Sequence, residues 1–450
     1  MFDLIIIGGG PAGYVAAERA GHKGMNVLLC EQNALGGVCL NEGCIPAKTL
    51  LYSAKTCENA LHSSKYGVFA ENVKFDLEKI IARKNKIVRK LVAGVNSKMQ
   101  QNHVTVLKGK AIIERRTAEG IEISCCGEIF KGANLLICTG SEAFVPTIPG
   151  LLQAADIVMT NREILSLKEQ PKSLVVIGGG VIGMEFASFY NTLGTKVTVV
   201  EMLPEILGAN DLEISAMLRD IYTRKGITFH LNAKVIKIES DKVIFEQNGQ
   251  TGIVECDKIL VSAGRQPVIR NFGLENLGVE LERGGIKVDT KMRTNVPCVF
   301  AAGDVTGFSL LAHTASREGE VVVNNLTGEP DEMRYNAIPS VVYTNPEVAA
   351  VGETEESARA KGIDCKVKKL AMAYAGRFVV ENEGGAGLCK IIADKDNRII
   401  GLHILGNPAS EMIFGAGIAI EQKMTIEQLQ HAVFPHPTVC EIIKETAFVL

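Results

Sequence analysis

The sequence lacks an apolar run long enough to span a membrane, a run of Lys and Arg, and histidines or cysteines at metal-ligand spacing. Gly, Lys, Glu or Asn interrupts every apolar run before it reaches the roughly 20 residues that a bilayer crossing needs. A formal charge of -3 and a pI near 6.3 provide no basic field for nucleic acid. We therefore expect no membrane span, no nucleic-acid partner and no metal.

We also expect no leader peptide, because a strand pattern, Leu4 to Ile7, follows Met1 almost at once. We expect a cytoplasmic protein. Its 12 cysteines then predict thiols and one catalytic pair rather than a disulfide framework. At 450 residues the chain exceeds the size of a single core, so we expect about three domains.

One phosphate-binding pattern occurs twice: a strand, a glycine turn, a small-residue helix, and a second strand that ends in an acid. The first copy has Gly8, Gly10, Gly13 and Glu31, and the second has Gly178, Gly180, Gly183 and Glu201. Each pair is offset by 170 positions, for example 178 minus 8 and 201 minus 31. Such glycines make the turn, admit a pyrophosphate and pack the helix on the strand, while the acid binds ribose hydroxyls.

Two dinucleotide sites in one chain indicate two cofactors, FAD and NAD, that exchange an electron pair. The carboxylate of Glu201 would repel the 2'-phosphate of NADP, and residues 202–207 supply no arginine to bind it. The second copy is therefore predicted to bind NAD.

Two cysteines five positions apart, Cys39 and Cys44, follow the first copy. In a regular helix their Cα atoms would lie about 8.7 Å apart, beyond the roughly 7 Å that a disulfide tolerates. A bond between them needs a distorted turn, which the nearby glycines permit, and Pro46 is suited to opening a regular helix afterwards. A helix N-terminus and Lys48 would favour a reactive thiolate at Cys44.

The segment from Gly36 to Lys48 resembles the active-site disulfide of the FAD-dependent pyridine nucleotide–disulfide oxidoreductases, and the resemblance covers essentially the whole chain. It implies that Cys39 is the interchange thiol that meets the substrate and that Cys44 is the charge-transfer thiol facing the flavin. It also implies that Lys48 lies near flavin N5 and pairs with Glu185.

Further segments resemble the same family. Three of these segments are expected to bind FAD: Thr139, Gly140 and Ser141 after the strand pattern at 135–138, Asp304 within Val299 to Val305, and Ala312 beside His313. Gly264, which follows the strand pattern at 259–262, is expected at the NAD site. Asp304 resembles the carboxylate that binds the ribityl chain, and His313 is expected to be structural.

A candidate base lies near the C-terminus. His436 stands between two prolines, and Glu441, five residues later, can hold one ring nitrogen and stabilise the cation. A dithiol must lose a proton before it attacks a disulfide, so the reaction needs such a base. In the family the partner subunit supplies this histidine, which implies an obligatory homodimer. The family commonly has another histidine at the position of Phe434, and this departure predicts altered packing around the base.

The predicted fold is α/β: two Rossmann-like domains that bind FAD and NAD, and a C-terminal α+β dimerisation domain. The expected boundaries are 1–148 for FAD, 149–268 for NAD, 269–336 for a central segment completing the FAD site, and 337–450 for the interface. We read the remaining cysteines, including Cys125, Cys126 and Cys440, as structural.

The resemblance to the lipoamide branch implies oxidation of protein-bound dihydrolipoamide with reduction of NAD. Tyr343 to Glu347 and Gly406 to Met412 match that branch. The implied partner is a lipoyl-bearing acyltransferase or the lipoyl protein of glycine cleavage. Two alternatives stay open: another disulfide reductase of the family, such as a glutathione-type enzyme, and a redox-sensing subunit with little turnover.

Overall fold

The computed structural model describes residues 1–449, which form two compact units. Unit 1 comprises residues 1–49, 81–144 and 264–334, and unit 2 comprises, among the described residues, 50–80, 145–263 and 335–449. Two helices, α3 (Cys44–Leu61) and α4 (Leu77–Gln101), contribute to both. The division into four domains predicted from the sequence stays a prediction.

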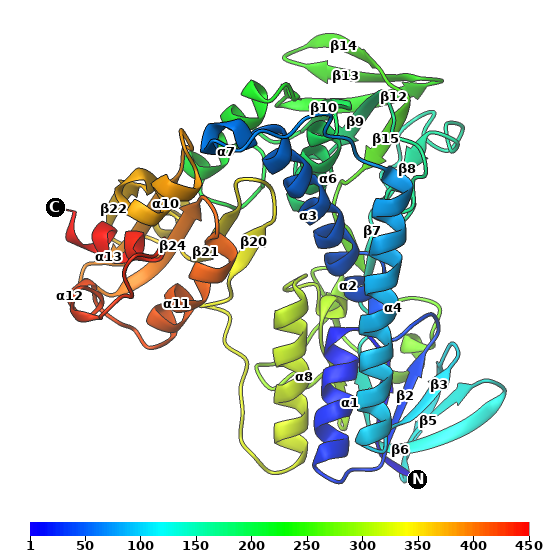
Figure 1. The fold of residues 1–450 in the computed structure, drawn as a ribbon. Helices are drawn as coiled ribbons and strands as arrows, with labels where there is room; N and C mark the ends of the chain where they lie inside the picture. Colours follow the sequence, from blue (N-terminus) through cyan, green and yellow to red (C-terminus); the bar gives the residue numbers. More distant parts are fainter. Residues whose placement is uncertain (450) are drawn as a thin grey trace. The chain divides into compact units, whose positions relative to one another are not determined.

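Unit 1 is built on a seven-stranded sheet in the order β3-β2-β1-β6-β5-β4, with β19 paired to β6 (Figure 1). Its strands are β1 (Phe2–Ile7), β2 (Val27–Glu31), β3 (Thr105–Lys108), β4 (Ile112–Thr117), β5 (Gly120–Cys125), β6 (Glu128–Ile137) and β19 (Val299–Ala301). The pairs β1–β2, β1–β6, β2–β3 and β6–β19 are parallel, and β4–β5–β6 is an antiparallel meander. The expected strand–helix–strand arrangement opens the chain.

Strand β1 lies inside this sheet, between β2 and β6, and its aliphatic side chains are buried accordingly. The last four residues of β1 are buried on both faces, as parallel strands covered on two sides require. Helices α1 (Pro11–His22) and α8 (Ala312–Leu326) pack against each other in the same unit (Figure 1). The remaining elements are α2 (Gly37–Asn41), β7 (Ser141–Ala143), β16 (Arg265–Pro267), η2 (Leu274–Leu277), β17 (Leu281–Glu282), β18 (Gly285–Ile286) and η3 (Asp304–Thr306).

Unit 2 contains the second strand–helix–strand copy in a five-stranded parallel sheet of order β11-β10-β9-β15-β8. The strands are β8 (Val158–Met159), β9 (Ser173–Ile177), β10 (Lys196–Val200), β11 (Thr228–His230) and β15 (Lys258–Val261), and the helices are α5 (Asn161–Ile164), α6 (Val181–Thr192) and α7 (Leu212–Arg224). An antiparallel meander, β12 (Ala233–Glu239), β13 (Lys242–Gln247) and β14 (Gln250–Glu255), follows β11.

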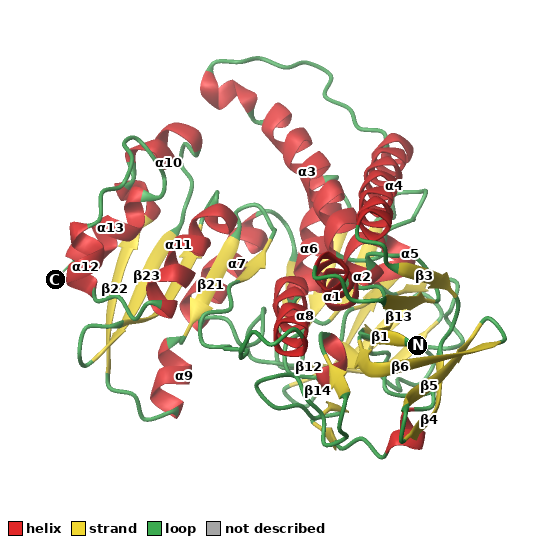
Figure 2. Cartoon of the chain, turned by 90° about the horizontal axis from the view of Figure 1, so that it is seen from below, coloured by secondary structure: helices red, strands yellow, loops and turns green. Residues whose placement is uncertain are grey.

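The C-terminal part of unit 2 is an antiparallel sheet of order β20-β21-β24-β23-β22, against which α11 and α13 pack (Figure 2). The strands are β20 (Ser340–Val342), β21 (Val348–Gly352), β22 (Cys365–Ala371), β23 (Leu388–Asp394) and β24 (Ile399–Leu405). One short helix of unit 2, η1 (Ser63–Tyr66), belongs to the 50–80 stretch. The C-terminal part contains the helices α9 (Glu355–Ala360), η4 (Met372–Tyr374), α10 (Gly376–Glu381), α11 (Ala409–Glu421), α12 (Ile426–His431) and α13 (Glu441–Phe448). Its antiparallel strands fit the α+β layer expected at the C-terminus.

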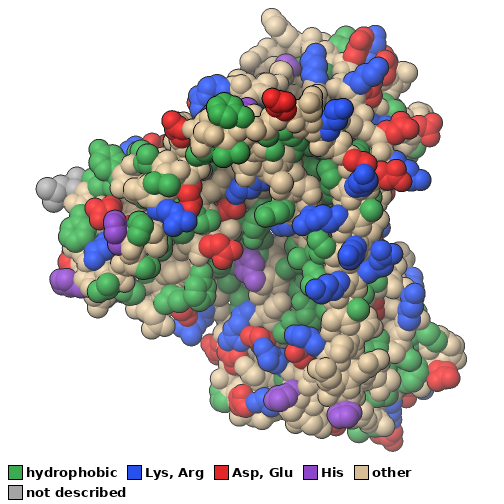
Figure 3. Space-filling model, in the orientation of Figure 1, with side chains coloured by type: hydrophobic (Ala, Val, Ile, Leu, Met, Phe, Trp, Pro, Cys, Tyr) green, Lys and Arg blue, Asp and Glu red, His purple; other side chains and the backbone are tan. Residues whose placement is uncertain are grey.

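On the face that Figure 3 shows, acidic and basic side chains are interspersed, in keeping with the small net charge. None of the helices in the described part of the chain has the length and apolar character that crossing a bilayer requires.

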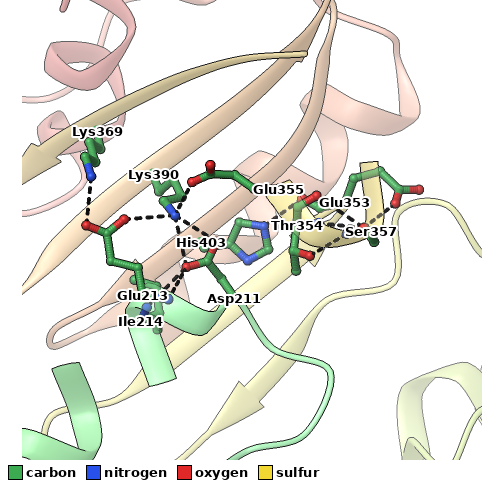
Figure 4. Close-up of polar contacts among 10 residues, drawn as sticks. All are labelled: Asp211, Glu213, Ile214, Glu353, Thr354, Glu355, Ser357, Lys369, Lys390 and His403. Atoms are coloured by element: carbon green, nitrogen blue, oxygen red, sulfur yellow. Dashed lines mark hydrogen bonds and ion pairs between the residues drawn. The ribbon is translucent and has the colours of Figure 1, made fainter. Parts of the chain in front are cut away.

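A buried ionic cluster lies between α7 and β23 (Figure 4). The Nζ atom of Lys390 lies 2.9 Å from Asp211, 2.9 Å from Glu213 and 2.6 Å from Glu355, and its side chain is 2% exposed. Burial lowers the pKa of Lys390, but hydrogen bonds to the three carboxylates outweigh it and raise the pKa overall. Asp211 also caps α7 by accepting from two backbone N–H groups. The charged lysine therefore ties the start of α7 to the C-terminal sheet.

We expect Lys390→Met to destabilise the protein by about 3–5 kcal/mol, because it leaves Asp211 buried without its cation. The matched control is Lys369→Met. Lys369 also pairs with Glu213, but its side chain is 54% exposed, so its loss should cost less than about 1 kcal/mol. Thermal unfolding at fixed protein concentration measures both. Equal losses for the two variants would contradict a special role for the buried pair.

Candidate functional site

The first glycine turn has the geometry that a pyrophosphate site needs. Gly8 has φ +105°, and a Cβ there would lie 2.1 Å from the carbonyl oxygen of Cys138. A Cβ on Gly13 would lie 1.8 Å from the Gly8 oxygen, so this glycine packs the helix on the strand. Around Gly10 the nearest atom would be 3.9 Å away, which leaves its backbone open to a ligand. This geometry supports the predicted division of tasks among the three glycines, and their roles toward a ligand stay a prediction.

The second turn repeats these features. Gly178 has φ +103°, and a Cβ on Gly183 would lie 2.1 Å from the Gly178 oxygen. A Cβ on Gly180 would meet nothing within 4 Å. Because both middle glycines begin a helix as its N-cap, unpaired N–H groups of the first turn are available to phosphate oxygens.

The two acids are held by the same backbone contacts in both copies. Gly9 N and Asn33 N each donate at 2.7 Å to Glu31, and Gly179 N and Leu203 N donate at 2.6 and 2.7 Å to Glu201. Both donor pairs keep the offset of 170 positions seen in the sequence. Since each carboxylate oxygen has a second lone pair, a fixed carboxylate can still accept hydrogen bonds from ribose hydroxyls.

The cysteine pair lies at a break between two helices. Cys39 lies inside α2, and Cys44 is the first residue of α3. Glu42 interrupts the helical backbone at φ -137°, which supplies the distorted turn that the spacing requires. The regular helix begins at Cys44 rather than after Pro46 as expected, because proline is tolerated in the first turn, where its missing N–H has no intrahelical partner.

The two thiols share a hydrogen bond, which raises the pKa of Cys39; burial and the Cys44 charge raise it further, and Lys48 lowers it. Cys39, Cys44 and Lys48 therefore interact electrostatically at the start of α3, and the reactive thiolate expected at Cys44 stays a prediction. Tyr14, directly after the third glycine on α1, also belongs here. Its pKa is raised by burial first, then by the charge of Cys39. The sequence patterns did not identify this phenol.

A polar cluster joins the predicted flavin segments in unit 1. Ser141 Oγ donates to Asp304 Oδ2 at 2.5 Å, and Arg265 donates from Nε to the same hydroxyl at 2.8 Å. Burial raises the pKa of Asp304, whereas Ser141 and the Arg265 charge lower it. Thr139 Oγ1 donates to the Val268 carbonyl at 2.7 Å, which fixes the neighbouring turn. Arg265 is a residue of this site that the sequence patterns did not assign.

Two backbone features complete the predicted flavin segments. Glu318, fully buried on α8, accepts a hydrogen bond from Gly303 N at 2.6 Å and so holds the turn before Asp304. Ala312 is the first residue of α8, where backbone N–H groups lack intrahelical acceptors and the helix dipole is positive. Ala312 can therefore donate to an electron-rich ring oxygen. Glu318 was not identified from the sequence, because it lies in an ordinary helical pattern.

Two further residues of the predicted site, Glu185 and Gly264, belong to different units. Glu185 is buried on α6, and its Oε1 accepts from Tyr343 N at 3.1 Å. Gly264 has φ +111° and belongs to unit 1, while the second glycine turn belongs to unit 2. The expected pairing of Lys48 with Glu185 joins the two units and stays a prediction.

The candidate base contacts its expected carboxylate. His436 Nδ1 lies 2.9 Å from Glu441 Oε1, and the other carboxylate oxygen accepts from Thr438 N at 2.8 Å. These contacts lower the pKa of Glu441, the Thr438 N–H most and His436 next. The His436 side chain is 79% exposed, so Nε2 faces outward with its lone pair when Nδ1 carries the proton. Within unit 2 this histidine has an orienting group.

Residues 2–319 match the model of the pyridine nucleotide-disulphide oxidoreductase family, and residues 338–447 match its dimerisation domain. The chain belongs to this family. The predicted fold class is confirmed, with a C-terminal dimerisation domain that supports a homodimer.

Several relatives resemble this chain over nearly their whole length. The chain is 39% identical to the dihydrolipoyl dehydrogenase of Chlamydia muridarum, covering 99% of this chain and 96% of the relative. It is 38% identical to that of Geobacillus stearothermophilus, covering 99% and 95%. Among solved structures, LpdA from Mycobacterium tuberculosis gives a TM-score of 0.90 at 26% identity over 99% of both chains. The flavoprotein disulfide reductase RclA from Escherichia coli gives 0.87 at 29% identity over 100% of both.

The predicted activity class and cofactors are confirmed: the chain is an oxidoreductase of the dihydrolipoyl dehydrogenase type, and FAD and NAD(H) are the cofactors of these family members. The residues fit them, because each copy has an open middle glycine beside a fixed carboxylate.

We expect Gly180→Ala to raise the KM for NAD by roughly tenfold, which corresponds to about 1.4 kcal/mol. The added Cβ meets no protein atom within 4 Å, so the fold should be retained while the methyl group obstructs the pyrophosphate. Gly94→Ala on α4 is the control, since its Cβ also meets nothing within 4 Å. Steady-state kinetics with flavin absorbance measure the effect. An unchanged KM in Gly180→Ala would contradict this placement of the dinucleotide.

Proposed function

We propose that the protein oxidises protein-bound dihydrolipoamide and reduces NAD through a disulfide between Cys39 and Cys44. The observation that carries this proposal is the interrupted helix, which brings the two thiols into a hydrogen bond beside Lys48. The dihydrolipoyl dehydrogenases of Chlamydia muridarum and Geobacillus stearothermophilus match nearly the whole chain at 39% and 38% identity, which supports this substrate over glutathione disulfide.

The chemistry begins at the base. Nε2 of His436 takes a proton from one substrate thiol, while Glu441 holds the ring and stabilises its cation. The resulting thiolate attacks the sulfur of Cys39, which breaks the disulfide and releases Cys44 as a thiolate. The second substrate thiol then attacks the substrate sulfur of the mixed disulfide and its proton passes to Cys39, so the substrate leaves as a cyclic disulfide and Cys39 leaves as a thiol. The substrate is oxidised by two electrons and the cysteine pair is reduced by two.

When bound, FAD would supply the redox chemistry that links the reduced cysteine pair to NAD. The residues proposed to hold FAD are the first glycine turn, Glu31, Thr139 to Ser141, Asp304 and Ala312, with Lys48 near the flavin ring. Glu201 is proposed to select NAD. Its carboxylate is buried and fixed by two backbone N–H groups, so it cannot turn away from a 2'-phosphate.

A partner subunit is proposed to complete each active site. His436 is exposed in a single chain, as a base that serves a neighbouring subunit requires. The dimerisation domain also exposes large apolar side chains that association would cover: Tyr374, Val380, Phe414, Ile418, Val433 and Phe448. We further propose the four-domain division predicted from the sequence, a cytoplasmic location, and a lipoyl-bearing acyltransferase or glycine cleavage protein as partner.

Cys44→Ser is expected to abolish turnover of dihydrolipoamide while FAD remains bound, because the pair can no longer form a disulfide. Cys57→Ser, farther along α3, is the matched control and should retain turnover. The assay measures NADH formation, with flavin absorbance as the measure of FAD content. The wild-type protein should prefer NAD to NADP and lipoamide to glutathione disulfide. Lipoamide turnover by Cys44→Ser would refute the assignment, and preferred use of glutathione disulfide would favour the glutathione-type alternative.

Hybrid dimers test the shared active site. His436→Gln alone should lower dihydrolipoamide oxidation by about 10²–10⁴-fold, the contribution typical of a general base. Dimers that combine a His436→Gln subunit with a Cys44→Ser subunit should regain activity, because one of their two sites then has an intact cysteine pair and an intact base. Activity of the hybrids is measured after mixing differently tagged, dissociated subunits. Hybrids no more active than either parent would show that both groups act within one chain.

A further inference from the structure

A second pair of thiols lies in unit 1 at the hairpin between β5 and β6. Cys125 pairs with Glu128 across the hairpin, so Cys126 and Gly127 form its two-residue turn. Both turn residues have positive φ, +53° and +83°, as a type I′ turn requires. Asn-Gly is the usual sequence for this turn, and a cysteine in left-handed backbone is uncommon.

The two sulfurs are close together, and one is accessible. Cys125 Sγ and Cys126 Sγ lie 3.8 Å apart; Cys125 is 2% exposed, whereas Cys126 is exposed. Gly109 lies beneath them, and a Cβ there would come within 2.5 Å of Cys126 Sγ and 3.0 Å of Cys125 Sγ. The missing side chain at Gly109 thus leaves room for two adjacent sulfurs on one side of the hairpin.

A third thiol assists the inner member of the pair. Burial raises the pKa of Cys125 most, the hydrogen bond with Cys126 raises it further, and a hydrogen bond with Cys30 lowers it. Burial raises the pKa of Cys30, so that thiol stays protonated and can donate to a Cys125 thiolate. The pKa of Cys125 is nonetheless raised overall, so Cys125 enters the reaction as a thiol, and Cys30 can donate to its sulfur once the proton leaves.

The spacing of the two cysteines fits a ligand that bridges both sulfurs better than it fits a disulfide between them. Adjacent Cα atoms across a trans peptide are about 3.8 Å apart, shorter than the roughly 4.4–6.8 Å that disulfides usually span. A direct bond would also require the sulfurs to close from 3.8 Å to about 2.05 Å. A soft atom bonded to both sulfurs avoids this strain, because it bridges them without an S–S bond.

We infer that Cys125 and Cys126 form a dithiol site that captures trivalent arsenic compounds with one organic substituent, separate from the Cys39–Cys44 pair. No group of three or more His, Cys, Asp or Glu side chains suited to a metal ion occurs among residues 1–449, so a ligand needing two sulfurs fits better than one needing more. The exposed Cys126 bonds first, and Cys125 then closes the ring.

Each thiol replaces one hydroxyl group on arsenic. Two As–O bonds break, two As–S bonds form, two thiol protons leave with the hydroxyls as water, and arsenic stays trivalent. No oxidant or reductant is needed. Because the second bond forms within one molecule, the ring resists exchange with a monothiol, whereas a dithiol can displace it.

The test uses phenylarsine oxide on the oxidised, FAD-containing protein, followed by desalting and intact-mass measurement. We expect one phenylarsenic group per chain, which glutathione leaves in place and dimercaptopropanol removes. Cys126→Asn should lose the adduct almost completely while retaining the fold, because asparagine suits the left-handed turn. Cys298→Asn is the matched control, since Cys298 is also exposed with φ +64°, and it should keep the adduct.

A double variant, Cys39→Ser with Cys44→Ser, separates this inference from the proposed function. It should still bind one phenylarsenic group at the hairpin, and Cys125→Ser in that background should lose it. A second adduct in the oxidised wild type that the double variant lacks would mean that Cys39 and Cys44 are not a disulfide, which would count against the proposed function alone. Absence of any adduct, or an adduct unchanged in Cys126→Asn and Cys125→Ser, would overturn the dithiol site.

Discussion

The protein's proposed chemistry depends on a helix that is interrupted between Cys39 and Cys44. An uninterrupted helix would hold the two Cα atoms about 8.7 Å apart, too far for a disulfide. The break at Glu42 lets α2 and α3 present their cysteines to each other, and it also makes Cys44 the first residue of α3. The same distortion thus brings the sulfurs together and places one of them at the positive end of a helix beside Lys48.

The acid that follows each of the two glycine turns is held in the same way. In each, a carboxylate is fixed by two backbone N–H groups, one from the glycine turn and one two residues beyond the acid. This arrangement orients the acid before any ligand arrives, so the cost of ordering it is met during folding. The carboxylate of Glu201 is buried and fixed, and we propose that it selects NAD by charge, because a mobile carboxylate could move away from an added phosphate.

Features within a short stretch of chain could be predicted from the sequence. The strand, turn and helix of each copy repeat a local pattern, and His436 and Glu441 are only five positions apart. Contacts that join distant segments of the chain could not be predicted from the sequence. Arg265 reaches Ser141 across 124 positions, and Lys390 reaches Asp211 across 179, and neither lies in a pattern that specifies its partner. Glu318 resembles a surface helix residue until packing of α8 against α1 buries it.

The most direct test of the central claim is an anaerobic titration of the oxidised protein with dihydrolipoamide, followed by flavin absorbance and thiol counting. If Cys39 and Cys44 form the first acceptor, the wild type should take up one electron pair per FAD beyond the pair that reduces the flavin, and two new thiols per chain should appear. Cys44→Ser should show neither. Uptake of only the flavin's own electron pair by the wild type, with no new thiols, would contradict the account.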